Sequence, residues 1–133
     1  AEIPLILKGI MTVKGAKKAL EAGAQAIVVS NHGGRVLDQC PSTAEVLPDI
    51  VKAVDGQMKV FVDGGIRTGT DVFKALAMGA DAALIARPFV TAAYGAGVQG
   101  VSAYTGKTGN ELRDTMAMCG AFSVKEITEE MLW

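Results

Sequence analysis

The chain has 133 residues, half of them hydrophobic, and its 13 basic and 14 acidic side chains give a formal net charge of −1. This balance gives no electrostatic support for binding nucleic acid or an anionic membrane surface. The single histidine and the widely spaced cysteines Cys40 and Cys119 lack the ligand spacing of a metal site. The longest apolar stretch, 80–98, is interrupted by charged residues and a proline, so we predict no membrane span.

The first third of the chain predicts two strands separated by a helix. An apolar run at 3–7 indicates a strand that ends at Lys8, and residues 14–22 favour a helix stopped by a glycine. The next run, 26–29, is wholly apolar, which is typical of a parallel strand covered on both faces. It leads directly into the polar segment 30–35.

The middle of the chain predicts two further helix and strand pairs. A helix capped by Ser42 or Thr43 is expected to become regular near Pro48, because proline is tolerated in a first helical turn. It is followed by a third strand. This third strand is expected at 60–62. The next helix, capped by Thr70, is expected at 71–78, and the fourth strand at 82–86.

The C-terminal third gives a weaker pattern. Residues 89–94 fit a short helix, whereas the five glycines in 95–109 should fray or interrupt any helix there. Residues 111–119 have helical periodicity, and the spacing of Ser123 and Glu126 predicts a capping box that opens a last short helix.

An internal repeat organises these elements. Shifting the sequence by 56 residues aligns Gly9 with Gly65, Lys18-Ala19-Leu20 with Lys74-Ala75-Leu76, and Ala26 with Ala82. Repeated β/α units are the building blocks of a (β/α)₈ barrel. We therefore predict an α/β fold of four parallel β/α units plus C-terminal helices. This is half of such a barrel, forming one domain over residues 1–133.

The segment Ser30-Asn31-His32-Gly33-Gly34-Arg35 is the first candidate functional site. It follows a buried strand, and α/β folds place their chemistry where the strands end. The imidazole of His32 transfers protons near neutral pH, and the planar fork of Arg35 fits a carboxylate or phosphate. The alternative is a structural role, with His32 bonded to backbone and Arg35 in solvent.

A second candidate site lies at the ends of the third and fourth strands. Barrels commonly bind phosphate at neighbouring strand ends, through glycine N–H groups and a helix N-terminus. Gly64 and Gly65 permit close backbone approach, while Arg67 and Arg87 supply positive charge. The structural alternatives are an ion pair between Arg67 and Asp71 and a salt bridge at the rim for Arg87.

Lys8 points toward the same rim, where a cation can stabilise negative charge on a cofactor; the alternative is a solvated lysine. No serine or cysteine stands beside a base as an activated nucleophile. A redox reaction here requires a cofactor, because the chain has no group of its own that takes up electrons.

Several segments carry a resemblance to a known family, and they are 7–10, 29–35, 63–67, 69–76 and 85–88. In these segments the chain resembles the FMN-dependent α-hydroxy-acid dehydrogenases and oxidases, which include glycolate oxidase and lactate oxidase. The resemblance covers nearly the whole chain. It implies the second half of a (β/α)₈ barrel, FMN as cofactor, and oxidation of a small 2-hydroxy acid to the 2-oxo acid.

The resemblance also implies roles for individual residues. His32 would be the catalytic base, and Arg35 would bind the substrate carboxylate. Lys8 would stabilise the anionic reduced flavin, with Ser30 also touching the ring system. The residues implied in binding the phosphate and ribityl parts of FMN are Asp63, Gly64, Gly65, Arg67, Ala86 and Arg87.

The chain departs from the family in three ways. Ala86 replaces a usual glycine, and Gly106 and Gly109 interrupt a segment that is a continuous helix in relatives. The family's first four β/α units are absent from this sequence. Because half a barrel leaves its outer strands unpaired, we expect closure by the missing N-terminal portion or by a second copy in a homo-oligomer.

Two other functions remain open from the sequence. One is a catalytically incomplete fragment or assembly module that binds phosphate or flavin weakly or not at all. The other is a phosphate-binding barrel enzyme resembling inosine monophosphate dehydrogenase or type 2 isopentenyl diphosphate isomerase. The first of these two enzymes needs a nucleophilic cysteine on a rim loop, and neither Cys40 nor Cys119 is at such a place.

The expected location is cytoplasmic. The segment Ala1-Glu2-Ile3-Pro4 resembles neither a signal peptide nor a transit peptide. The two distant cysteines are simplest to explain in a reducing compartment.

Overall fold

The computed structural model describes residues 3–132. Ala1 and Glu2, which begin the segment used above to predict that there is no targeting peptide, lie outside the described residues, as does Trp133, the end of the predicted domain.

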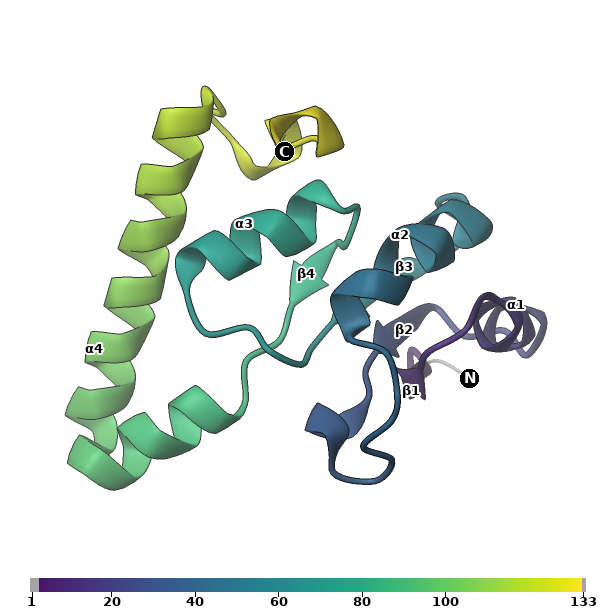
Figure 1. The fold of residues 1–133 in the computed structure, drawn as a ribbon, viewed down its shortest axis with the longest axis horizontal. Coiled ribbons are helices and arrows are strands. Elements are labelled where there is room, and N and C mark those ends of the chain that lie inside the picture. Colours follow the sequence, from purple (N-terminus) through teal and green to yellow (C-terminus); the bar gives the residue numbers. More distant parts are fainter. Residues whose placement is uncertain (1–2, 133) are drawn as a thin grey trace.

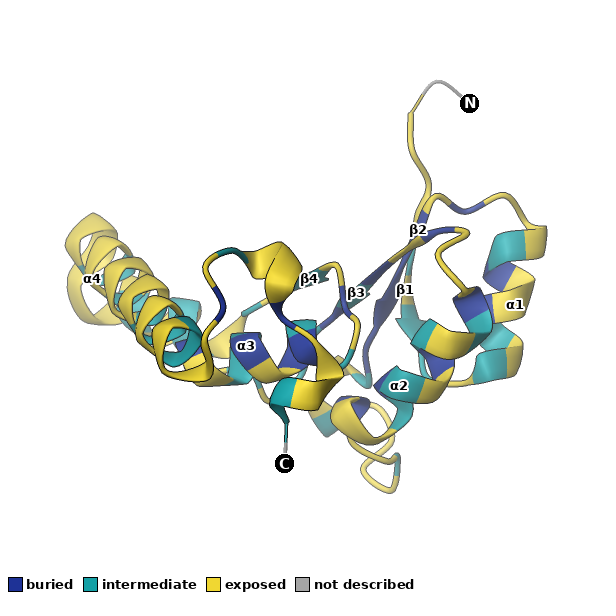
Figure 2. Cartoon of the chain, turned by 90° about the horizontal axis from the view of Figure 1, so that it is seen from above, coloured by how far each residue is buried: buried dark blue, intermediate teal, exposed yellow. Residues whose placement is uncertain are grey.

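Four parallel strands form one sheet in the order β1-β2-β3-β4. Their bounds are Ile6–Ile10, Ala26–Val29, Lys59–Val62 and Ala82–Ala83. A helix follows each of the first three strands, and Figure 2 shows these helices along one face of the sheet. The predicted fold class, four parallel β/α units amounting to half of a (β/α)₈ barrel, is confirmed.

The helices bury their apolar faces against alternate residues of the strands. Strand side chains alternate between the two faces of a sheet, so one set meets the helices. The helices α1, α2 and α3 span Val13–Glu21, Thr43–Val54 and Gly69–Ala77. The main core is made by strand residues Ile27, Val29, Val60 and Val62 with helix residues Ala16, Ala19, Leu47, Ile50, Val54 and Ala75.

The helix α2 begins a turn earlier than the sequence predicts. Ser42 caps it: its hydroxyl accepts from Glu45 N at 3.3 Å, and the Glu45 carboxylate accepts from Ser42 N at 2.6 Å. Hydrogen bonding of the Glu45 carboxyl group with the Ser42 side chain, and then with the Ser42 backbone, lowers the pKa of Glu45. This capping box starts the helix at Thr43 although Pro48 then lies inside it, so the prediction of a regular start near Pro48 was wrong.

The two outer strands differ from their predicted bounds. The strand β1 lies three residues further on than predicted, so Lys8 is inside it, and the register shifts between Lys8 and Ile10 at Gly9, whose φ is 95°. The strand β4 ends at Ala83 rather than at 86, because only two of its residues pair with β3. Within the described sheet, β1 and β4 are the edge strands, as predicted.

The C-terminal region contains a long helix. The helix α4, Arg87–Cys119, is broken only at Ala96 and Gly97 and folds back there into a hairpin beside α3 (Figure 1). The prediction that a helix within 95–109 is frayed or interrupted is confirmed by this break, whereas the predicted interruption at Gly106 and Gly109 is wrong.

The chain ends in two single 3-10 turns, η2 (Val124–Glu126) and η3 (Glu129–Met131), next to α3. The predicted capping box at Ser123 is not formed, because the Glu126 side chain bonds to Phe122 N and to the Ser123 hydroxyl instead. Within residues 3–132 no helix combines the length and the apolar character needed to cross a bilayer.

Candidate functional site

A groove of about 710 Å³ lies at the carboxyl ends of the strands. Lys8 of β1 and the segments that follow β2, β3 and β4 in the sequence contribute most of its walls. The predicted site residues that line it are Lys8, His32, Arg35, Asp63, Gly64, Gly65, Arg67, Ala86 and Arg87. The fold thus brings residues from four separate segments into one opening. Ser30 is the one predicted site residue that does not line the groove.

The loop after β2 holds His32 in a left-handed backbone conformation. The turn η1 spans His32–Gly34, and its first residue has a φ of 54°. Such a conformation costs a non-glycine residue about 1–3 kcal/mol and persists only where neighbouring contacts impose it. Here Asn31 Oδ1 accepts from Gly33 N at 3.0 Å, and Ser30 Oγ accepts from His32 N at 3.2 Å. The loop therefore presents an exposed imidazole from a strained backbone that local hydrogen bonds maintain.

Lys8 connects β1 to the ends of β2 and β3. Its ammonium lies 2.6 Å from Asp63 Oδ2 and donates to Ser30 Oγ at 2.7 Å. Ser30 is only 1% exposed, so its hydroxyl supports Lys8 and the His32 amide from below rather than facing the groove. These two contacts fix the Lys8 ammonium among the residues that line the groove.

Asp63 carries an unused acceptor. While Oδ2 pairs with Lys8, the other carboxylate oxygen, Oδ1, is buried and has no hydrogen-bond partner. A buried acceptor of this kind costs stability unless a ligand or water donates to it. It therefore fits the hydroxyl group of a polyol chain, such as the ribityl chain of a flavin nucleotide.

Arg87 crosses from the β4 end of the groove to the His32 loop. Its Nη2 donates to the Gly33 carbonyl at 2.7 Å. A Cβ atom on residue 33 would lie 2.0 Å from that nitrogen, so a larger residue would displace the guanidinium from this position. A guanidinium has five N–H donors, and this contact leaves others for an anion.

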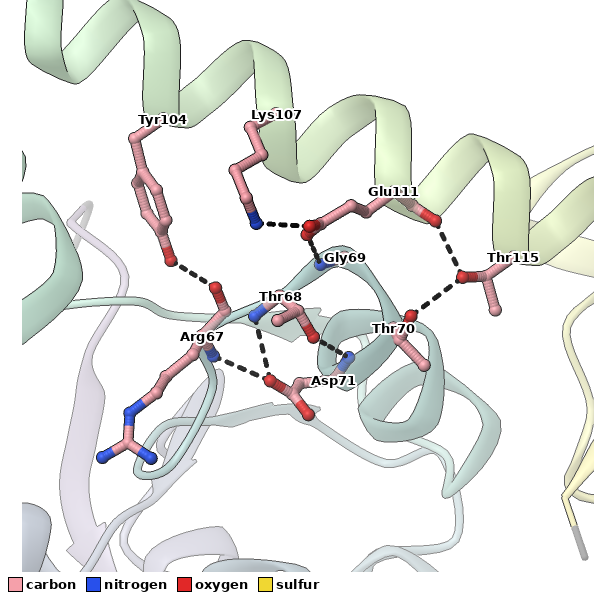
Figure 3. Close-up of polar contacts among 9 residues, drawn as sticks. All are labelled: Arg67, Thr68, Gly69, Thr70, Asp71, Tyr104, Lys107, Glu111 and Thr115. Atoms are coloured by element: carbon pink, nitrogen blue, oxygen red, sulfur yellow. Dashed lines mark hydrogen bonds and ion pairs between the residues drawn. The ribbon is translucent and has the colours of Figure 1, made fainter.

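Arg67 is fixed through its backbone. Asp71 accepts from the backbone N–H of Arg67 at 3.0 Å and from that of Thr68 at 2.9 Å. Figure 3 shows the Arg67 guanidinium directed away from this carboxylate. The alternative in which the Arg67 side chain forms an ion pair with Asp71 is therefore not what the structure shows.

Three helix N-termini lie near the groove, those of α2, α3 and α4, and they differ in how they are capped. At α2, the capping box of Ser42 and Glu45 occupies the N-terminus. At α3, Asp71 and Glu111 occupy the amides of residues 67–69, so carboxylates already take the place of an anion there. At α4, Ala86 provides no side-chain cap, and Pro88 occupies the first turn. The helix N-terminus that suits a phosphate is thus that of α4, beside Arg87.

Sequence reasoning missed four residues that shape the site. Asn31 caps η1, and the Thr43 hydroxyl donates to Gly64 O at 3.3 Å, which holds the glycine turn against α2. Tyr104 and Glu111 reach the turn after β3 from α4. The asparagine before a turn could have been recognised from the sequence. Tyr104 and Glu111 could not, because they lie some 40 positions from their partners in the sequence.

The cysteines lie away from the groove. Cys40 is half-buried, Cys119 is exposed near the end of α4, and neither is among the residues that line the opening. This placement gives no support to the alternative that needs a nucleophilic cysteine on the rim. In the described part of the chain, no three His, Cys, Asp or Glu side chains are grouped so that they could hold a metal ion.

Sequence comparison identifies the chain's relatives. The family model described as FMN-dependent dehydrogenase matches residues 1–133. A 2-hydroxyacid oxidase of Dictyostelium discoideum is 47% identical over 132 residues, covering 99% of this chain and 34% of that protein. A peroxisomal (S)-2-hydroxyacid oxidase of Arabidopsis thaliana is 48% identical (96% and 35% covered), and an L-lactate oxidase of Roseobacter sp. is 46% identical (98% and 35%). The chain therefore spans about a third of the length of these relatives.

Solved structures agree with this assignment. A mandelate oxidase crystallised with 3,3-difluoro-2-hydroxy-3-phenylpropionic acid superposes with a TM-score of 0.94 at 46% identity, covering 97% of this chain and 39% of that one. A mandelate oxidase variant with a monooxide FMN adduct gives a TM-score of 0.92 at 48% identity, covering 94% and 40%. The chain belongs to the FMN-dependent dehydrogenase family, whose cofactor is FMN.

Proposed function

We propose that this chain is the part of an FMN-dependent enzyme that carries its catalytic base and its phosphate-binding residues. We propose further that the enzyme oxidises a small 2-hydroxy acid to the 2-oxo acid. The observation that carries the proposal is that His32, Arg35, Arg67 and Arg87 line one groove. A substrate and a flavin bound in that groove would lie side by side. The relatives' names, which include 2-hydroxyacid and lactate oxidases, support the substrate class.

His32 and Arg35 handle the substrate in this proposal. Oxidation of a 2-hydroxy acid removes two electrons and two protons from the H–C–O–H unit; FMN, when bound, would accept both electrons and one proton, and His32 would accept the other proton. His32 takes up a proton as the base, from a loop whose strained backbone keeps the imidazole over Gly9. Arg35 pairs its guanidinium with the substrate carboxylate and fixes the orientation of the α-carbon.

Lys8, Asp63 and Arg87 hold the cofactor along the groove. The Lys8 ammonium offers a positive charge to the flavin ring, and the unpaired Asp63 oxygen accepts a hydrogen bond from the ribityl chain. Arg67 and Arg87 neutralise the phosphate, together with backbone N–H groups of Gly64 and Gly65 and of the uncapped end of α4 at Ala86. Ser30 acts through Lys8, to which its hydroxyl is bonded.

A second candidate is a module that folds and binds FMN or phosphate but is catalytically incomplete alone. The open edges of β1 and β4 favour it, since large apolar side chains such as Ile6 and Leu84 are exposed there. Pairing with the remaining barrel strands, or with a second copy, would cover both edges.

The two free cysteines favour a reducing compartment such as the cytoplasm.

The test is anaerobic reduction of the flavin in the complete protein that carries this sequence. Addition of lactate or glycolate should bleach the yellow flavin absorption. We expect His32→Gln to retain FMN and slow reduction by about 10²–10⁴-fold, the usual contribution of a general base. Arg35→Lys should instead raise KM, because lysine loses the bidentate fork. A bound flavin that no 2-hydroxy acid reduces would refute the proposal, and activity in the complete protein but not in the isolated chain would establish the second candidate for the chain alone.

A further inference from the structure

The turn that carries Arg67 is held by side chains from α4 (Figure 3). The Tyr104 hydroxyl donates to the carbonyl oxygen of Arg67 at 2.7 Å, while Asp71 accepts from Arg67 N at 3.0 Å. Both backbone polar groups of Arg67 are therefore fixed, which restrains the two peptide planes that set the direction of its side chain. The Tyr104 bond joins positions 37 residues apart, so only tertiary structure creates it.

The same helix approaches the next residues of that turn at backbone distance. Glu111 accepts from Gly69 N at 2.9 Å and also pairs with Lys107, and these two contacts lower the pKa of Glu111. A Cβ atom on residue 69 would lie 2.1 Å from Leu112 N. The beginning of α3 is thus docked directly on α4, and the Arg67 turn cannot shift independently of that helix.

Tyr104 also contacts the segment that carries the second arginine. Its ring packs edge-to-face on Phe89, with ring centroids 4.8 Å apart and planes at 84°. Phe89 lies two residues after Arg87, in the first part of α4. The Tyr104 side chain therefore hydrogen-bonds to the Arg67 backbone through its hydroxyl and packs on the Arg87 segment through its ring.

We propose that Tyr104 is a positioning residue for the phosphate end of the flavin site. It fixes the spacing between Arg67 and Arg87, so that both guanidinium groups meet one phosphate without a reorganisation cost on binding. This inference rests on the proposed function, in which the two arginines bind the FMN phosphate. It adds a determinant of cofactor affinity that touches neither cofactor nor substrate.

The experiment compares the affinities of FMN and riboflavin, which lacks the phosphate, in the complete apoprotein by flavin fluorescence. Tyr104→Phe keeps the ring contact and removes only the hydroxyl. We expect it to raise the Kd of FMN by about three- to tenfold, the loss of roughly one hydrogen bond, and to leave the Kd of riboflavin unchanged. Tyr94→Phe is the matched control, because Tyr94 is 91% exposed and should change neither value.

Arg67→Leu separates failure of this inference from failure of the proposed function. If Arg67→Leu weakens FMN but Tyr104→Phe does not, Tyr104 has no positioning role and the proposed function stands. Equal weakening of FMN and riboflavin by Tyr104→Phe would show a general structural role and overturn the inference. If Arg67→Leu leaves FMN affinity unchanged, the phosphate site itself is refuted, and the inference with it.

Discussion

The close packing of α3 on α4 predicts opposite effects for the same substitution at two glycines. At Gly69, an added Cβ would lie 2.1 Å from Leu112 N and 2.3 Å from Thr108 O. The first distance is about 1.3 Å short of the 3.4 Å at which ordinary van der Waals contact begins. Both neighbouring atoms belong to backbone, so no side-chain rotation relieves the clash and the two helices must separate.

The magnitude follows from this geometry. Overpacking of a rigid site typically costs about 1–3 kcal/mol, and displacement of backbone places Gly69→Ala at the upper end of that range. Gly106 also lies in α4, but nothing is within 4 Å of its added Cβ. Gly106→Ala should therefore stabilise the protein by about 0.5–1 kcal/mol through the helix preference of alanine.

Thermal unfolding followed by far-UV circular dichroism measures both effects. At about 3 °C per kcal/mol, we expect Tm to fall by about 6–9 °C for Gly69→Ala and to rise by about 2–3 °C for Gly106→Ala. If Gly69→Ala unfolds at the same temperature as the unsubstituted protein, the backbone contact between α3 and α4 is not present in solution. That result would also remove the basis for the inference that α4 holds the turn that carries Arg67.

Two further predictions concern the core and the pH dependence of stability. Leu47→Ala should lower the free energy of unfolding by about 2–5 kcal/mol in urea titrations, because Leu47 is fully buried. Val36→Ala is the control and should change that free energy little, because Val36 is 82% exposed. Similar effects at both positions would contradict the assigned core. Partial burial disfavours the ionised Asp71 carboxyl, but hydrogen bonds from Arg67 and Thr68 outweigh it and lower its pKa below 3.8. The stabilisation is therefore complete above that pH and disappears as the pH falls through the lowered pKa, so Asp71→Asn should cost about 1 kcal/mol at pH 7 and progressively less as the pH falls through that pKa. A pH-independent difference would exclude this role of the charge.

The fold was predictable because its signals are local. A wholly apolar run identified β2, and repeated glycines marked the ends of the β/α units, so the number and order of the four strands follow from the sequence. The bounds of β1 were not predictable, since Lys8 usually marks a strand end. Here Ser30 and Asp63 stabilise its charge inside the strand, and both partners are distant in sequence.

The long C-terminal helix shows what local propensity omits. Glycines at 106 and 109 weaken an isolated helix, but contacts of Glu111 and Thr115 with α3 and of Tyr104 with the turn before it stabilise it in the fold. The candidate site shows the same limit. The positions of His32, Arg35, Arg67 and Arg87 at strand ends were readable, whereas the α4 residues that hold the Arg67 turn depend on how two helices dock.

The hydrogen bond from Arg87 to the Gly33 carbonyl makes two parts of the groove mechanically dependent on each other. One guanidinium reaches the turn that displays the imidazole from the place where the anion is expected to sit. If the proposed function holds, a change at position 87 would perturb both cofactor retention and the geometry of the proton acceptor. Cofactor affinity and turnover could then not be tuned separately through this side chain.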